Sequence, residues 1–308
     1  MPKPLLVVGS VNADLYVEID RLPAPGETLD GSNAAMRPGG KGANQAAAAA
    51  RLGQATWFAG QLGTDAFASA LRVALGDAGV KLDHLAMVEG PTGQAFILLQ
   101  RGGENSIIIV GGANQRWGQI PGALASRIAS AGAVLLQREI PDEVNLLVAR
   151  LAKTANVPVV MDVGGADRPL SPELLGLVAV LSPNESELAR LTGMATSTRD
   201  EVVTAARSLM RSGVATVLVK LGKRGALLVS AANEPIEHPA FPVSVVDTTG
   251  AGDCFTAAYT VALLEGQSER NRLGFACSAA ALCIQKKGAM PSMPLRSEVE
   301  QFQSRHQR

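Results

Sequence analysis

The chain has 308 residues, of which 47% are hydrophobic, so it can bury an extensive core. Its 28 basic residues balance 28 acidic residues, and this neutrality argues against nucleic acid or an anionic membrane as a partner. The longest uncharged apolar stretch, Leu273–Ile284, is shorter than the ~18 residues that a membrane span requires.

Short apolar runs alternate with longer stretches of helical character, such as Asp142–Lys153 and Arg199–Ser212. Strands that are apolar on both faces and alternate with helices are typical of a parallel sheet between two helical layers. We therefore predict an α/β fold, a three-layer sandwich with a mainly parallel central sheet. The predicted strands are Leu5–Val8, Val134–Leu136, Val157–Met161, Val178–Leu181, Val217–Lys220 and Ala226–Val229.

Three early segments depart from this rhythm. Leu15–Ile19 alternates apolar with polar residues, and Ala95–Gln100 and Ser106–Val110 flank a turn that contains Gly102 and Gly103. Such segments indicate strands with one exposed face and, for the last two, a hairpin. We predict a single domain over residues 1–308 with an inserted β-sheet lid, formed from roughly 14–40 and 94–112.

The cysteines indicate a reducing compartment. Cys254, Cys277 and Cys283 are odd in number and have no C-x-x-C spacing, which argues against a disulfide framework and against a zinc site. The first residues are also too short an apolar stretch for a signal peptide. We therefore expect a cytoplasmic protein.

The most informative motif is residues 247–253, which read Asp-Thr-Thr-Gly-Ala-Gly-Asp. It follows a strand-like stretch, Val243–Val246, and precedes an apolar helix, Cys254–Leu264. Glycines at a helix start let backbone N–H groups converge on an anion at the positive end of the helix dipole. A carboxylate there, Asp253, can accept a proton from a hydroxyl that attacks phosphorus. A plain helix N-cap is the alternative.

A second glycine-rich segment, residues 39–45, reads Gly-Gly-Lys-Gly-Ala-Asn-Gln and leads into a predicted helix, Ala46–Arg51. Its glycines allow close approach of a ligand to the backbone. It is not a P-loop, because Gly42 follows the lysine where Ser or Thr must bind magnesium. A tight turn with a solvated lysine remains the alternative.

Three further polar segments follow predicted strands. Asn12 and Asp14 lie just after the first strand, where α/β sheets bind ligands, and they suit sugar hydroxyls unless they only form a turn. Asn184 and Glu187 suit magnesium or its water shell, or else cap an acidic helix. Residues 220–225 form either a loop that covers a nucleotide or a simple basic hairpin.

Taken together and in this order, the motifs resemble those of the PfkB-type carbohydrate kinases, the ribokinase family. The resemblance runs from residue 5 to about residue 296, and the segments 39–44 and 287–292 resemble the family's ribose-specific members most. It implies MgATP-dependent phosphorylation of D-ribose at its 5-hydroxyl, giving ribose 5-phosphate and ADP. It also implies a homodimer that forms through the lid.

The resemblance implies a role for each matching residue. It makes Asp253 the catalytic base and places the anion hole at Gly250, Ala251 and Gly252. The implied sugar contacts are Asn12, Asp14, Gly40, Lys41, Asn44, Glu139 and Asp253. The implied ATP contacts are Asn184, Lys220, Gly222, Gly225, Gly252 and Cys277. Glu187 would hold Mg²⁺ through water, and the implied K⁺ site comprises Asp247, Thr249, Cys283, Lys286, Gly288 and Ser292.

Three residues depart from the family's pattern. Arg138 stands where an apolar residue is usual, which suggests a charge at the pocket rim or an altered substrate choice. Cys277 replaces a polar residue near the adenine, and Lys286 is a cation near the implied K⁺ site. Other readings therefore stay open: a kinase for another pentose, a deoxysugar or a nucleoside, and a sugar sensor without catalysis.

Overall fold

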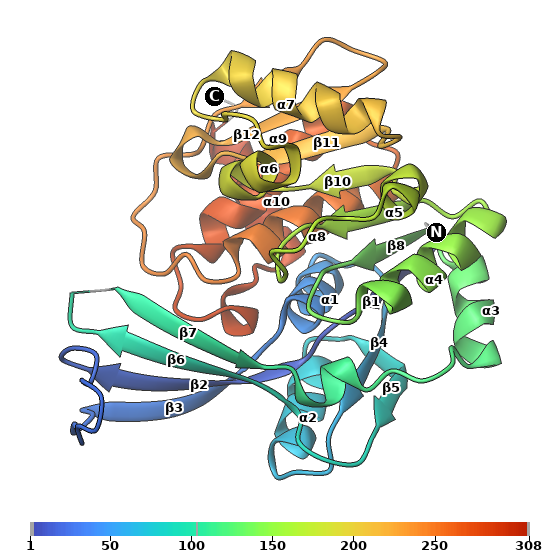
Figure 1. The fold of residues 1–308 in the computed structure, drawn as a ribbon. Helices are drawn as coiled ribbons and strands as arrows, with labels where there is room; N and C mark the ends of the chain where they lie inside the picture. The colour runs from blue at the N-terminus through green and yellow to red at the C-terminus, as the bar shows by residue number, and fades with distance from the viewer. Residues whose placement is uncertain (1–2, 103, 307–308) are drawn as a thin grey trace.

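A computed structural model of the chain describes residues 3–102 and 104–306, and this part contains a nine-stranded and a four-stranded sheet (Figure 1). The strands are β1 (Leu5–Val8), β2 (Asn12–Ile19), β3 (Asn33–Gly39), β4 (Thr56–Leu62), β5 (Lys81–Met87), β6 (Gly93–Gln100), β7 (Asn105–Val110), β8 (Ala133–Leu136), β9 (Val159–Asp162), β10 (Val180–Ser182), β11 (Thr216–Lys220), β12 (Ala226–Ser230) and β13 (Ile236–His238).

The helices largely follow the strands in alternation, as βα units require. They are α1 (Lys41–Arg51), α2 (Phe67–Asp77), α3 (Gly122–Ser130), α4 (Asp142–Thr154), α5 (Pro172–Leu177), α6 (Glu185–Thr192), α7 (Arg199–Arg211), α8 (Ala251–Leu264), α9 (Glu269–Cys283) and α10 (Arg296–His306). Short 3₁₀ turns occur at Gly112–Gln115, Gly222–Arg224 and Met290–Ser292. None of the helices in the described residues is long and apolar enough to span a bilayer.

The large sheet has the order β13-β12-β11-β10-β9-β8-β1-β4-β5 and is parallel except at β12 and β13. Because side chains alternate along a strand, Leu5 and Val7 of β1 enter one apolar core while Leu6 and Val8 enter another. The first core also contains side chains of α1, α2, α8, α9 and α10, and the second contains side chains of α3 to α7. The predicted α/β fold with a mainly parallel sheet is confirmed.

The small sheet has the order β3-β2-β6-β7 and projects from the body of the molecule (Figure 1). The predicted hairpin is confirmed, because β6 and β7 pair antiparallel from Gln94 with Val110 to Leu99 with Asn105. Gly103 of the predicted turn lies outside the described residues. Asn12 and Asp14 belong to β2 itself, so they are strand residues and do not form the turn that was the alternative.

Several predicted bounds shift by one to three residues, and two predicted elements differ more. Helix α1 begins at Lys41, five residues before the predicted start. Glycines usually disfavour a helix, which is why the prediction starts later. Here Gly42 is required because the backbone of another segment lies close to it. A Cβ at Gly42 would lie 2.6 Å from the backbone nitrogen of Ser10. The predicted strand Val243–Val246 is wrong: this segment pairs with no strand of the part of the chain that the structure describes, and Val245 and Val246 are 60% and 53% exposed.

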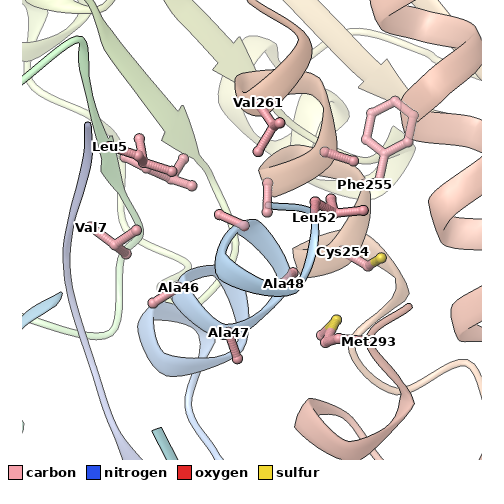
Figure 2. Close-up of a cluster of buried hydrophobic side chains, with 14 of the residues drawn as sticks. Leu5, Val7, Ala46, Ala47, Ala48, Leu52, Cys254, Phe255, Val261 and Met293 are labelled. Atoms are coloured by element: carbon pink, nitrogen blue, oxygen red, sulfur yellow. The ribbon is translucent and has the colours of Figure 1, made fainter. Parts of the chain in front are cut away.

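Helices α1 and α8 pack together at the centre of the first core. Figure 2 shows Ala48 of α1 on the side of the helix toward Cys254 at the start of α8, with Ala46 and Ala47 on the same helix. Small side chains allow two helices to approach closely, and all three alanines are fully buried. This contact brings the polar residues at the start of α1 next to Asp253 at the start of α8.

Candidate active site

The start of α8 has the geometry that the glycines of the 247–253 motif predict. Gly250 has a φ of 78°, and a Cβ there would lie 2.9 Å from Cα of Ala289. The first N–H groups of a helix have no acceptor within the helix, so this turn can stabilise a negative charge. The turn at Gly250, Ala251 and Gly252 is thus a candidate anion site, although the N–H of Ala251 donates to the carbonyl oxygen of Thr248 at 3.2 Å.

The carboxylate of Asp253 lies buried in this first turn and is 5% exposed. It accepts hydrogen bonds from Nδ2 of Asn44 at 2.9 Å and Nε2 of Gln45 at 3.1 Å. Burial raises the pKa of Asp253 above its ordinary value, although the Lys41 ammonium opposes this change. A fixed carboxylate with a raised pKa is suited to accept a proton during a reaction.

The amide that orients Asp253 is itself held in place. Gln137 at the end of β8 donates through Nε2 to Oε1 of Gln45 at 2.7 Å, and Asn145 of α4 donates to the carbonyl oxygen of Gln137. This chain of buried amide donors restricts rotamers that would otherwise be free, although Oε1 of Gln137 and Oδ1 of Asn145 have no partner among the described residues. Oδ1 of Asn44 has no hydrogen-bond partner among the described residues although it is buried, so it remains an acceptor for a bound ligand.

A carboxylate and an amide of β2 face the same region. Asp14 stands over Gly39 of the paired strand β3, where a Cβ would approach the Asp14 carboxylate to 2.0 Å. Burial and the neighbouring carboxylates of Glu139 and Asp253 raise the pKa of Asp14 to about 7. Asn12 is 3% exposed, and its Oδ1 accepts from Nδ2 of Asn114 at 2.7 Å.

Glu139, which follows β8, holds the start of α1. Its Oε2 accepts from the backbone N–H of Lys41 at 3.0 Å and from Oγ of Ser10 at 2.6 Å. Gly40 is the N-cap of α1 with a φ of 87°, and a Cβ there would lie 2.8 Å from the backbone nitrogen of Asn12. These contacts bring Gly40, Lys41 and Glu139 together, and all three are among the predicted sugar contacts.

A cavity of about 1110 Å³ adjoins this polar cluster. Lys41 and Asp253 line it at the cluster side, whereas the other predicted sugar contacts are not among its lining residues. Its lining also includes Phe241, Val245 and Cys277, which form an apolar part. All six residues predicted to contact ATP line the cavity: Asn184, Lys220, Gly222, Gly225, Gly252 and Cys277.

Asn184 and Glu187 form a capping box at the start of α6, as the simpler alternative predicts. Oδ1 of Asn184 accepts the N–H of Glu187 at 2.8 Å, and Oε2 of Glu187 accepts the N–H of Asn184 at 2.7 Å. Both residues also line the cavity. No hydrogen bond reaches Oε1 of Glu187 from the residues that the structure describes, so capping leaves that oxygen available for hydrated Mg²⁺.

The residues of the predicted K⁺ site lie in two segments that meet beside the anion site. Asp247 joins them, because its carboxylate accepts the N–H of Thr249 at 2.9 Å and the N–H of Gly288 at 2.8 Å. Sγ of Cys283 lies 3.0 Å from Oγ of Ser292, and both residues are fully buried. The ammonium of Lys286 pairs with Glu298 instead of facing Asp247.

Arg138 does not lie at a pocket rim, so that interpretation is wrong. Its side chain is 1% exposed, pairs with Asp142 at 2.8 Å and donates to the carbonyl oxygens of Ala166, Arg168 and Pro169. Its role is to hold the loop that follows β9. A buried arginine needs several acceptors to offset its lost hydration, and this loop provides them.

Several buried polar residues of the site were not among the predicted contacts. They are Ser10, Gln45, Asn114, Gln137, Asp162 and Thr256. Ser10 and Gln45 lie inside the motifs that were recognised. Asp162 carries the same signal as Asn12, since it is a polar residue directly after the predicted apolar strand Val157–Met161.

Comparison with known proteins shows which family this chain resembles over most of its length. The model of the pfkB family of carbohydrate kinases matches residues 3–296. A ribokinase of Arabidopsis thaliana is 52% identical over 302 residues, which cover 96% of this chain and 80% of that protein. A ribokinase of Haemophilus influenzae is 38% identical over 98% of this chain and 99% of its own. The solved structure of the Arabidopsis ribokinase complexed with ribose and ATP has a TM-score of 0.95 at 51% identity, with 98% of this chain and 99% of that chain covered.

Proposed function

The chain belongs to the pfkB family of carbohydrate kinases, and from that premise we propose that it phosphorylates D-ribose at the 5-hydroxyl with ATP. The observation that carries this proposal is the place of Asp253, between the polar cluster of Asp14 and Glu139 and the cavity of about 1110 Å³. A carboxylate at that junction can serve a sugar on one side and a nucleotide on the other. The ribose and ATP bound to the Arabidopsis structure support this assignment.

The reaction follows from the geometry of the start of α8. The sugar hydroxyl attacks the γ-phosphorus of ATP, the bond between that phosphorus and the ADP oxygen breaks, and the hydroxyl proton passes to Asp253. The N–H groups of the first turn stabilise the negative charge on the transferred group. Asn44 and Gln45 hold the carboxylate in position for the proton. Glu187 would hold Mg²⁺ through water, and an ion there would supply positive charge to the phosphate oxygens of ATP.

The lid, the dimer and the cellular location stay proposals. We propose that the four-stranded sheet closes over the sugar, which is supported by the burial of Asn12 and Asp14 on β2. A homodimer through this sheet is supported by the exposed apolar side chains of Met36, Phe96 and Ile108, which pairing and alternation place on its other face. The three free, buried cysteines support a cytoplasmic location.

A substrate screen tests the proposed reaction. Purified protein with MgATP is given D-ribose, 2-deoxyribose, other pentoses and a nucleoside, while ADP release is followed and the product is identified by ³¹P NMR. We expect the highest kcat/KM with D-ribose and a phosphate on carbon 5. A nucleoside as the best substrate would contradict the proposal, and sugar binding without any ADP release would instead favour a sensor.

Activation by K⁺ is expected from the segments that meet at Asp247. An ion held by carbonyl oxygens near Thr249 and Gly288 would order the loop that leads into the anion site, which the hydrogen bonds of Asp247 already join to residue 288. We expect kcat to rise when KCl replaces choline chloride at constant ionic strength. A rate that does not respond to K⁺ across the millimolar range would remove the ion site and leave the kinase proposal intact.

A further inference from the structure

Asp162 is a buried carboxylate to which the reaction described above assigns no role. It ends β9, lines the cavity and is 2% exposed. Its Oδ1 accepts the N–H of Gly164 at 2.9 Å, and its Oδ2 accepts from Nζ of Lys220 at 2.7 Å and from Oγ1 of Thr256 at 2.8 Å. One of these partners, Lys220, lines the same cavity.

These partners come from separate elements of the fold. Lys220 ends β11, Thr256 lies on α8 three residues after Asp253, and Gly164 belongs to the loop after β9. The side chain of Lys41 packs on that loop, because a Cβ at Gly164 would lie 2.8 Å from Cε and 3.0 Å from Nζ of Lys41. One carboxylate thus lies between two lysines and the helix that carries the proposed base.

Lys220 reaches the anion site. Its Nζ would lie 3.7 Å from a Cβ at Gly252, so its ammonium stands beside the first turn of α8, and its side chain is 14% exposed. A lysine in the open has many rotamers, and one that pairs with a buried carboxylate keeps few of them. The pair with Asp162 therefore holds the ammonium close to the backbone N–H groups of this turn. A phosphate oxygen bound to those N–H groups would also contact the ammonium.

We propose that Asp162 is a positioning residue for phosphoryl transfer, which holds Lys220 in contact with the transferred phosphoryl group. This inference rests on the proposed kinase reaction. No bond forms or breaks at Asp162 or Lys220. Lys220 contributes positive charge where negative charge develops as the group passes from ADP to the sugar, and Asp162 fixes the position of that charge.

A purely structural ion pair is the competing explanation, since breaking any buried pair destabilises a protein. The two explanations differ in what changes. A structural pair would affect the stability of the protein and both substrates alike. A positioning role affects the reaction with ATP while ribose binding is unchanged, and it requires that Asp162 acts through Lys220.

The test uses Asp162→Asn, Lys220→Met and the double variant, with kcat/KM for ATP, the Kd for ribose and Tm measured for each. We expect kcat/KM for ATP to fall between about 10- and 100-fold in each single variant, as for a misplaced catalytic group. The Kd for ribose should stay within about twofold. The double variant should be no slower than Lys220→Met alone, because the effects of residues that act as a unit are not additive.

Glu173→Gln is the matched control, since it removes one carboxylate from an exposed pair with Arg150, and neither residue is among those that line the cavity. Losses that multiply in the double variant, or an Asp162→Asn protein that folds and keeps its rate within about twofold, would overturn the proposal. If Asp162→Asn fails to fold, the double variant still decides, because it leaves no lysine unpaired. If the double variant fails to fold while Lys220→Met folds, Asp162 has a structural role. If ribose proves to be the wrong sugar, the proposed function fails, and the same comparison is made with the best substrate.

Discussion

Replacing Asp253 by Asn is expected to lower kcat by about 10²- to 10⁴-fold, the usual cost of losing a positioned general base. The carboxylate is fixed by Asn44 and Gln45 at 2.9 and 3.1 Å, and it lies in the turn that we propose as the anion site. An Asn side chain keeps one acceptor oxygen for these donors but cannot take the proton. The Kd for ribose should therefore change little while turnover is lost.

The stability of the variant separates chemistry from misfolding. The pKa of Asp253 is raised, mainly by burial, so the folded state disfavours its ionised form and loses stability as pH rises through the native pKa. Asp253→Asn should consequently have a Tm at pH 8 at least equal to that of the unmodified protein. Asp200→Asn, which alters an exposed carboxylate in the first turn of α7, is the matched control. An Asp253→Asn protein that keeps more than about a tenth of kcat would contradict the base assignment.

The sequence predicts those strands that are continuous runs of apolar residues, because such a run indicates burial by itself. Leu5–Val8 and Val217–Lys220 are apolar runs, and they form β1 and β11 with the predicted bounds or within one residue of them. Val243–Val246 has the same apolar character but becomes a loop, because prolines at 239 and 242 precede it and no neighbouring strand pairs with it. An apolar run indicates that a segment is buried. Whether the segment becomes a strand depends on whether the fold places another strand beside it.

The candidate site could be predicted where a motif combines several residues in sequence. Asp253, Lys41 and Asn44 belong to two such motifs, and the structure brings both motifs together. Asp162 and Thr256 lie 94 positions apart, and only the register of β9 beside β10 and the position of α8 bring them together. Long-range pairs of this kind have no local sequence signal. A single sequence therefore identifies the residues that contact a ligand more readily than the residues that hold those side chains in position.

Asp14→Ala is expected to raise the KM for ribose by about one to two decades while the KM for ATP changes little. A buried hydrogen-bonding group that loses its partner costs about 1–3 kcal/mol, which corresponds to that change in affinity. Asp14 lies on β2, faces Gly39 and is not among the residues that line the cavity proposed for ATP. Asp20→Asn is the control, since it alters an exposed carboxylate just beyond the same strand. Equal rises in both KM values would remove Asp14 from the sugar site.

The pH dependence of ribose binding gives an independent test of the same residue. Burial, together with Glu139 and Asp253, raises the pKa of Asp14 to about 7, so the carboxylate is mostly protonated at pH 6 and mostly ionised at pH 8. Because the ionised form offers two charged acceptor oxygens and binds sugar hydroxyls more strongly than the neutral carboxyl, the Kd for ribose should fall about tenfold between these values. Asp14→Asn cannot ionise, and its Kd should stay high and nearly constant over the same range. A Kd of the unmodified protein that is flat between pH 6 and pH 8 would show that Asp14 does not bind the sugar as a carboxylate.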